Sequence, residues 1–363
     1  MGRLSFAPAL ILFACVAATG MAKDIRIAII PRAAGGDFWD AVHAGALKAK
    51  KDLATANHLD IDLFWLPPGG EGTAADQAAL IDKVSHARFD GLALAPIDPA
   101  ALKAPVDIAA RDGLPILIFE TPLSSARTIG YIGTNHFEAG QLAAGLVGKL
   151  SGGQGAILLV GDPEKSGNVS QCARGFVDGA RIYPNLFLLS GGDYAETVPA
   201  ARPGDVPALL KKYNTRVTGV FVVDPAALDA TLQAMQGAGL GDRKLIQVAF
   251  GSSKAMVDAL REERLQGLVI DSPFEIGYRM VRMMAGSLLG QKVGLRNDVP
   301  VALLTPEKLR DPANAEVLNP PVAEYLKLAP DEQKPTPPAP APADKPAAAL
   351  APAKTPAITP QAP

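Results

Sequence analysis

Polar and aromatic residues gather directly after the short apolar runs of this chain. The first such group, Gly36-Asp37-Phe38-Trp39, places two adjacent aromatics where a helix should begin after the run IRIAII at residues 25–30. Ligands of parallel sheets bind beyond the carboxyl ends of the strands, so these residues are candidates for a small-molecule site. Asp, Ser and Asn also occur there as helix N-caps, and the pattern alone leaves both roles open. The remaining groups are Pro96-Ile97-Asp98, Glu120-Thr121, Asp162 to Gln171, Asp193-Tyr194, Asp224-Pro225, Gly251-Ser252-Ser253 and Asp271-Ser272.

Common catalytic motifs are missing from the sequence. It contains no Gly-x-Ser-x-Gly elbow and no HExxH helix, and GDPEKSGN at 161–168 lacks the Gly-Lys-Ser/Thr ending of a phosphate-binding loop. We therefore expect a binding protein rather than an enzyme, with no metal and no cofactor. The four histidines are too scattered to share a metal-ligand spacing: His43, His58, His86 and His136.

Ten apolar runs of strand length supply the elements that must position these groups. The runs are continuously hydrophobic, which is typical of strands buried on both faces in a parallel sheet. The stretches between them have helical spacing. Repeated β-α units predict a doubly wound α/β architecture. Ten or more strands are too many for one compact sheet of this kind, which predicts two sheets and hence two lobes. The expected helix faces are Val42, Ala46, Ala49 and Leu53; Leu142, Leu146 and Leu150; and Leu228, Leu232 and Met235.

Both ends differ from this folded middle. The N-terminus, MGRLSFAPALILFACVAATGMAKD, has one arginine and then an apolar run, which indicates a signal peptide at residues 1–22, cleaved after Ala22, and a periplasmic protein. Leu12 to Cys15 also resembles a lipoprotein box with Cys15 as the lipidated residue, but the bulky Phe13 argues against it. The segment 329–363 is rich in Pro, Ala and Lys and lacks aromatics, so we expect a disordered tail that serves as a tether or spacer.

Charge and cysteine content exclude further classes of protein function. The 363 residues are 48% hydrophobic and carry 35 basic against 37 acidic side chains, a balance that argues against an extended nucleic-acid surface. Once the signal peptide is removed, Cys172 is the one cysteine left, which rules out a disulfide within the chain. Its spacing with Val169 and Phe176 predicts a small core residue on a helix, with a reactive thiol as the alternative.

Six segments carry a resemblance to a known family. They are FDGLALAPIDPAAL, GLPILIFETPL, YIGTNHFEAGQLAAGLV, ARGFVDGARIYPN, GVFVVDPAALDATLQAM and VIDSPFEIGYRMV, each with the family's order of strand, loop residue and helix. From Asp24 to Leu309 the chain resembles a periplasmic sugar-binding protein of the ribose/galactose-binding type, the substrate-binding subunit of an ABC importer. A related class of repressors shares this body but begins with a helix-turn-helix, whose place the signal peptide takes here.

The resemblance implies the periplasmic binding protein type I fold. Two doubly wound parallel-sheet lobes would be joined by three hinge crossings, and closure of the lobes would trap the ligand. The crossings would fall near Thr134-Asn135, Asp271-Ser272 and Val299-Pro300. Lobe one would comprise residues 24–134 plus 272–299, and lobe two residues 135–271 plus 300–328. We expect the protein to be a monomer.

Carried across residue by residue, the resemblance also implies a ligand site. Phe38 and Trp39 would lie against the apolar C–H face of a sugar ring, with packing beneath the loop as the alternative. Glu120, after the fourth strand, would accept hydrogen bonds from sugar hydroxyls. The other implied cleft residues are Asn168, Ser170, Tyr194, Asp224, Gly251 and Asp271.

The chain departs from the family pattern at three positions. Thr121 stands where an arginine follows the acid in ribose binders, Ser170 replaces a second arginine, and Gly251 replaces an aspartate. The cleft would then keep aromatics and acceptors but lose guanidinium donors, which disfavours ribose. Three ligand classes stay open: another sugar or an amino sugar, an amine or quaternary ammonium group, and a larger or less polar molecule.

The function expected from these observations is capture of a small sugar-like ligand and its delivery to an ABC permease. The alternative is a periplasmic sensor that presents a solute, such as an amine or a less polar molecule, to a membrane receptor or kinase. Fold and cleft would be the same in both cases, and neighbouring genes for a permease and ATPase, or for a kinase, would discriminate between them.

Overall fold

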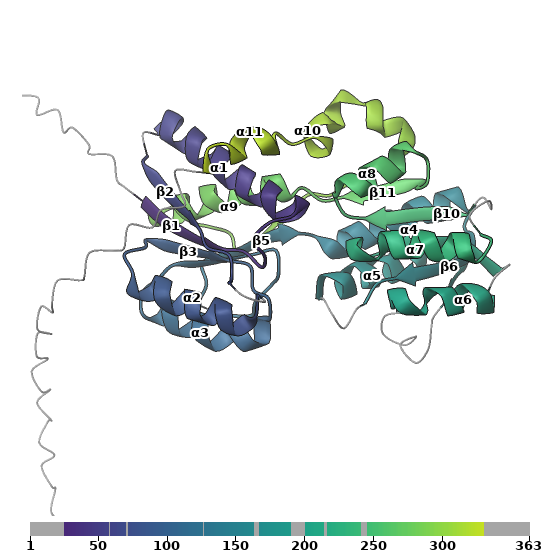
Figure 1. Ribbon diagram of the computed structural model, residues 1–363, viewed down its shortest axis with the longest axis horizontal. Coiled ribbons are helices and arrows are strands. Elements are labelled where there is room, and N and C mark those ends of the chain that lie inside the picture. Colours follow the sequence, from purple (N-terminus) through teal and green to yellow (C-terminus); the bar gives the residue numbers. More distant parts are fainter. Residues whose placement is uncertain are drawn as a thin grey trace, which may run out of the picture.

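The structure is a computed structural model of the chain, and it describes residues 25–57, 59–69, 72–125, 127–162, 167–189, 200–213, 216–240 and 245–329. Within these ranges the chain forms two sheets that lie beside each other, each with helices on both faces (Figure 1). The expected signal peptide, Cys15 and residues 330–363 of the expected tail lie outside the described residues. No described helix combines the length and apolar character that a membrane crossing requires.

The first sheet has six parallel strands in the order β12-β5-β4-β3-β1-β2. Two helices cover each face and bury separate apolar clusters, which explains why β3 and β4 are buried along their whole length. The strands are β1 Ile25–Ile30, β2 Ile61–Trp65, β3 Gly91–Leu94, β4 Ile116–Phe119, β5 Gly130–Thr134 and β12 Arg296–Val299. The helices are α1 Asp37–Asn57 and α9 Pro273–Leu288 on one face, and α2 Ala74–His86 and α3 Pro99–Arg111 on the other.

The second sheet has the order β13-β11-β10-β9-β6-β7, with β8 paired to β6 off this path. All its pairs are parallel except β11 with β13. The strands are β6 Gln154–Val160, β7 Asn185–Leu189, β8 Ala200–Ala201, β9 Val217–Val222, β10 Ile246–Phe250, β11 Gly267–Ile270 and β13 Ala302–Leu304. α4 His136–Leu150 and α5 Gly167–Ala180 cover one face, and α6 Val206–Tyr213, α7 Leu228–Gly237 and α8 Lys254–Arg261 the other.

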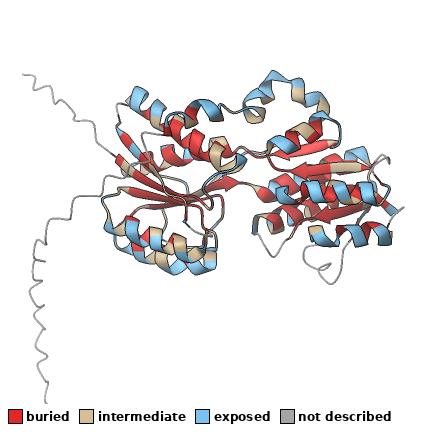
Figure 2. Cartoon of the chain, in the orientation of Figure 1, coloured by how far each residue is buried: buried red, intermediate tan, exposed pale blue. Residues whose placement is uncertain are grey.

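The predicted fold class is confirmed, and all ten apolar runs are strands. The buried strands and the exposed outer faces of the helices are visible in Figure 2. Three short strands escaped prediction, because β8, β12 and β13 have two to four residues each and β12 is largely polar. One expected helix face is wrong: Leu150 is exposed at the end of α4, whose buried face is made by smaller residues such as Ala139, Ala143 and Val147.

The chain passes between the two sheets three times. After β5 of the first sheet, the chain continues into α4, which packs on the second sheet. After β11 it returns to the first sheet with α9, and after β12 it crosses again to β13, which pairs with β11 of the second sheet. We call the first sheet with α1, α2, α3 and α9 lobe one, and the second sheet with α4 to α8 lobe two. The carboxyl ends of β4, β5 and β11 lie next to these passages, so the residues that follow them are brought near the centre of the molecule.

The segment after β13 returns to lobe one. It runs through the short helices η5 Pro306–Arg310, η6 Pro312–Asn314, α10 Ala315–Leu318 and α11 Val322–Leu326 (Figure 1). α11 packs on α1, where Tyr325 and Ala329 are buried with Ala44 and Leu47. The assignment of 300–328 to lobe two is therefore wrong for its end. The physical reason is a second apolar stripe on α1, which faces away from the sheet and which α11 covers.

Replacing the ring of Tyr325 should destabilise the protein. The side chain is 9% exposed and packs against Phe274, with 6.0 Å between the two ring centroids. We expect Tyr325→Ala to lower the free energy of unfolding by about 2–4 kcal/mol, through lost burial and a cavity, as measured by urea unfolding.

Two controls accompany this measurement. Tyr325→Phe keeps the ring and should change the free energy of unfolding by less than about 1 kcal/mol. A chain shortened after Ala329 removes the proline-rich tail but keeps α11, and should unfold as the full chain does. Wild-type stability of Tyr325→Ala would mean that α11 contributes nothing to lobe one.

Candidate functional site

A buried amide fixes the loops at the carboxyl ends of β1 and β3. Gln77 Nε2 donates to the carbonyl oxygens of Pro31 and Ala95, both at 2.9 Å, and Gln77 Oε1 accepts from the backbone amide of Ile97 at 2.8 Å. The side chain is fully buried and both ends of its amide are paired. The loops that follow β1 and β3 are thus held to α2.

The two adjacent aromatics in the first turn of α1 form a chain of edge contacts that leads toward β4. The ring of Phe38 meets that of Trp39 at 5.0 Å and 77°, and Trp39 meets Phe119 at 6.2 Å and 75°. Both side chains, Phe38 and Trp39, are half-buried and pack in part against the core of lobe one. Phe119 directly precedes Glu120, so Trp39 contacts the chain neighbour of the residue that the sequence singled out as an acceptor.

Glu120 has a strained backbone that several contacts hold in place. Its φ of 59° lies in the left-handed region, which a non-glycine residue adopts at a cost of about 1–3 kcal/mol. Its amide donates to the Ile132 carbonyl at 2.9 Å, and its carbonyl accepts from the Tyr131 hydroxyl at 3.0 Å. A Cβ at Gly133 would lie 2.2 Å from that hydroxyl oxygen, so glycine is required there for the close approach.

The Glu120 side chain meets residues of lobe two. It is 7% exposed, and its Oε1 accepts from Asn168 Nδ2 at 3.0 Å. His136 Nε2 lies 3.5 Å from the same oxygen, a charge contact without hydrogen-bond alignment. Asn168 lies in the first turn of α5 and His136 begins α4, so a lobe-one carboxylate contacts two helix starts of lobe two.

Asp271 is the second buried carboxylate at this place. It follows β11 and is 4% exposed. Burial raises the pKa of this carboxyl to about 6, and the negative charge of Glu120 adds to the shift. A hydrogen bond from Ser252 and the charge of His136 act in the opposite direction and lower the pKa. Because these charges act on one another, Glu120, His136 and Asp271 form one electrostatic cluster.

Unpaired polar atoms concentrate in this cluster. Within the described ranges, the buried side-chain nitrogens and oxygens without a hydrogen-bond partner are Glu120 Oε2, Thr134 Oγ1, His136 Nδ1 and Nε2, and Asp271 Oδ1. Leaving such an atom unpaired costs about 1–3 kcal/mol, which is why they are rare in folded proteins. Their gathering at the passages between the lobes indicates a site whose hydrogen bonds are completed by another molecule.

The other sequence-predicted site residues are more dispersed. Ser170 is half-buried on α5, and Asp224 caps η4 Pro225–Ala227 by accepting from Ala226 N at 3.1 Å. Gly251 has a φ of 137°, and a Cβ there would lie 2.7 Å from Met256 Sδ, so the backbone excludes the aspartate of the resembled family. Tyr194 lies outside the described residues.

Two residues of the cluster, Thr134 and His136, were not among the ligand-binding residues predicted from the sequence. Both flank the first passage between the lobes, and that position was the available signal. Arg32 follows β1 and its Nη1 donates to Thr121 Oγ1 at 3.4 Å. An arginine from another loop thus reaches Thr121, where the family arginine would stand.

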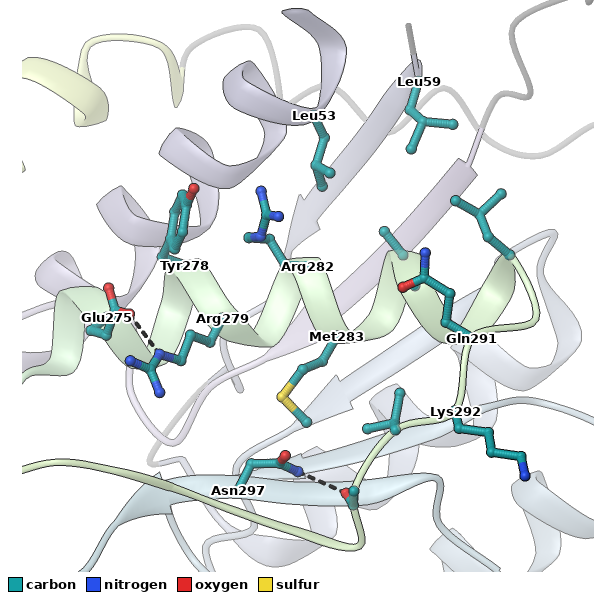
Figure 3. A pocket seen from close by; sticks show the side chains of 15 residues that line it. Leu53, Leu59, Glu275, Tyr278, Arg279, Arg282, Met283, Gln291, Lys292 and Asn297 are labelled. Atoms are coloured by element: carbon teal, nitrogen blue, oxygen red, sulfur yellow. Dashed lines mark hydrogen bonds and ion pairs between the residues drawn. The ribbon is translucent and has the colours of Figure 1, made fainter. Parts of the chain in front are cut away.

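Two cavities are present whose linings do not include Glu120 or Asp271. One, of about 540 Å³, sits on the outer side of lobe one between α9, the end of α1 and the loop before β12 (Figure 3). Several of its polar side chains are already paired, such as Glu275 with Arg279 at 2.6 Å. The other, of about 840 Å³, lies between α1, α8, α9 and the returning C-terminal segment. The second cavity is lined by Ser252, the hydrogen-bond partner of Asp271, and by Ser272, so it borders the cluster, whereas the first does not. We place the candidate site at the carboxylate cluster because the unpaired polar atoms gather there.

Comparison with known proteins identifies the family. Residues 27–292 match the model of the periplasmic binding protein domain, and the chain belongs to this family. Its fold, two α/β lobes with mostly parallel sheets, is that of type I periplasmic binding proteins. A search among curated protein sequences gave no significant match.

Solved structures with a similar fold include sugar-binding proteins of transporters. An ABC transporter solute-binding protein from Agrobacterium vitis with bound D-fucose is 22% identical over 81% of this chain and 100% of that one, with a TM-score of 0.68. A carbohydrate transporter solute-binding protein from Agrobacterium radiobacter, in complex with D-arabinose, is 23% identical over 82% and 99% of the two chains, with a TM-score of 0.64. A glucose-galactose binding protein from Geobacillus stearothermophilus is 18% identical over 79% and 99%, with a TM-score of 0.67.

The raised pKa of Asp271 predicts a pH-dependent stability. Its folded value of about 6 exceeds the ordinary 3.8, so the folded protein holds this proton more tightly and Asp271 destabilises it increasingly as the pH rises through about 6. The side chain of the Asp271→Asn variant stays neutral at every pH, so the variant should have a free energy of unfolding about 1–3 kcal/mol above that of wild type at about pH 8. This difference between variant and wild type should shrink as the pH falls toward about 4.

Urea unfolding of the two proteins across this pH range is the measurement. Asp62→Asn, at an exposed position on β2, is the matched control and should change little at any pH. A stability difference between Asp271→Asn and wild type that is the same at all pH values would contradict the raised pKa.

Proposed function

We propose that this chain is a periplasmic solute-binding protein that captures a small polyhydroxylated ligand between its lobes and delivers it to an ABC permease. The observation that carries the proposal is the set of buried, unpaired polar atoms at Glu120, Thr134, His136 and Asp271, where the chain passes between the lobes. Membership of the periplasmic binding protein family supports it, as do similar folds in proteins solved with D-fucose and D-arabinose.

The geometry suits capture by closure of the lobes. Among the described residues, hydrogen bonds already span the lobes: Asn168 Nδ2 donates to the side chain and the carbonyl of Glu120, and the backbone amide of Lys254 donates to Asp37 Oδ2 at 3.2 Å. A ligand at the cluster would form hydrogen bonds with both lobes at once. It would therefore bind more tightly to the closed arrangement than to an open one, and so would favour closure. Trp39 would supply the apolar face that covers a sugar ring.

The remaining features agree with a carrier role. The predicted signal peptide would export the chain, and the proline-rich tail would act as a tether. Because its unpaired groups suit binding and the family is one of binding proteins, we propose no reaction for the site. Binding of the purified, ligand-loaded protein to a reconstituted permease encoded beside it would establish delivery; binding to a sensor kinase instead would assign the alternative role.

Ligand binding should stabilise the protein. We expect a thermal-shift screen of the chain without residues 1–22 to find a sugar or polyol that raises the melting temperature, with small-angle scattering showing contraction. A ligand at 100 times its dissociation constant adds about 2.7 kcal/mol to the free energy of unfolding. An unchanged radius of gyration with saturating ligand would contradict closure.

Removing the indole of Trp39 should weaken binding of the ligand found in that screen. Trp39→Ala should cost about 1–3 kcal/mol of binding free energy, by analogy with stacking of bases on aromatic side chains, as measured by isothermal titration calorimetry. Trp39→Phe keeps an aromatic face and should lose less. Wild-type affinity of a folded Trp39→Ala would show that the aromatic pair only packs against the core.

A further inference from the structure

The carboxylate cluster carries more negative than positive charge. Glu120 and Asp271 are 7% and 4% exposed, and each has one oxygen without a hydrogen-bond partner. Within the described part of the chain, the one cationic side chain that pairs with either of them is His136, at 3.5 Å from Glu120. Arg32, the nearby guanidinium, donates to Thr121. One imidazole supplies at most a single positive charge against two carboxylates.

Such an imbalance has a physical cost that a ligand can remove. A buried carboxylate is stable when it is paired with an opposite charge and fully hydrogen-bonded. A neutral hydroxyl completes one hydrogen bond but leaves the charge uncompensated. An ammonium group brings three donors and one positive charge, which matches the two unpaired oxygens. The indole of Trp39 contacts Phe119, the residue before Glu120, and would add a π face, which favours a cation.

We propose that the preferred ligand is a hydroxylated amine, such as an amino sugar, whose ammonium group binds between Glu120 and Asp271. This inference rests on the proposed function and assigns its substrate class. The ammonium donates to Glu120 Oε2 and Asp271 Oδ1. Hydroxyls of the same ligand pair with Thr134 Oγ1 and with the His136 ring, which hold the other unpaired atoms of the cluster.

The experiment compares amino sugars with their neutral partners. Calorimetry of the chain without residues 1–22 would measure binding of galactosamine, glucosamine and mannosamine, each beside its parent hexose and its N-acetyl derivative, at about pH 7.5. We expect at least one amino sugar to bind about tenfold or more tightly than both neutral forms. The preference should persist at high salt, because a buried charge pair is screened much less than a surface one.

Variants of the same shape but without the charge test which carboxylates bind the ammonium group. Glu120→Gln and Asp271→Asn keep the shape of each side chain and remove its charge. Each should lower the amine-to-hexose affinity ratio about tenfold or more, whereas Glu262→Gln, an exposed acid at the end of α8, should leave the ratio unchanged. Thermal unfolding verifies that each variant is folded.

The outcomes separate this inference from the proposed function. A hexose that binds as tightly as its amino derivative overturns the inference and leaves the proposed function standing. An amine preference that survives in both Glu120→Gln and Asp271→Asn overturns the placement of the ammonium group. If none of these sugars binds, and neutral polyols fail as well, both the inference and the proposed function are wrong.

Discussion

Burial of the Glu120 carboxylate at the junction of the two sheets is the constraint on which the site depends. A carboxylate shielded from water needs partners, and this one receives a hydrogen bond from Asn168 and a charge contact from His136, both on lobe two. The groups that face it, including Asp271, are thereby drawn into one electrostatic cluster. The unpaired atoms that remain are the ones that the proposed ligand would supply with partners.

The surrounding structure holds this carboxylate in a conformation it would not adopt alone. The left-handed backbone of Glu120 is fixed by hydrogen bonds from its amide to Ile132 and from the Tyr131 hydroxyl to its carbonyl, and Gly133 leaves the space for that approach. Gln77 ties the neighbouring loops to α2 in the same way. The strain and the unpaired atoms coincide at one place, as is common at binding sites.

The returning C-terminal segment adds a connection that bears on lobe movement. α11 packs on α1, while β13, earlier in the same segment, pairs with β11 of lobe two. The cavity of about 840 Å³ beneath it is lined by residues of both lobes, among them Asp37 and Lys254, whose hydrogen bond spans them. Rotation of one lobe against the other must therefore change the shape of this cavity and the course of the segment above it.

The sequence by itself determined the fold class, because strands buried on both faces are continuously apolar and appear as ten distinct runs. It also predicted Glu120 and Asp271, since residues after strands lie at the carboxyl edge of a sheet. The tertiary structure decided which of these positions meet. Thr134 at the end of β5 and His136 at the start of α4 join Glu120 and Asp271. In addition, α11 returns to lobe one, and the backbone of Gly251 excludes a side chain. Such pairings depend on three-dimensional approach and on the burial of charge, which local sequence patterns do not encode.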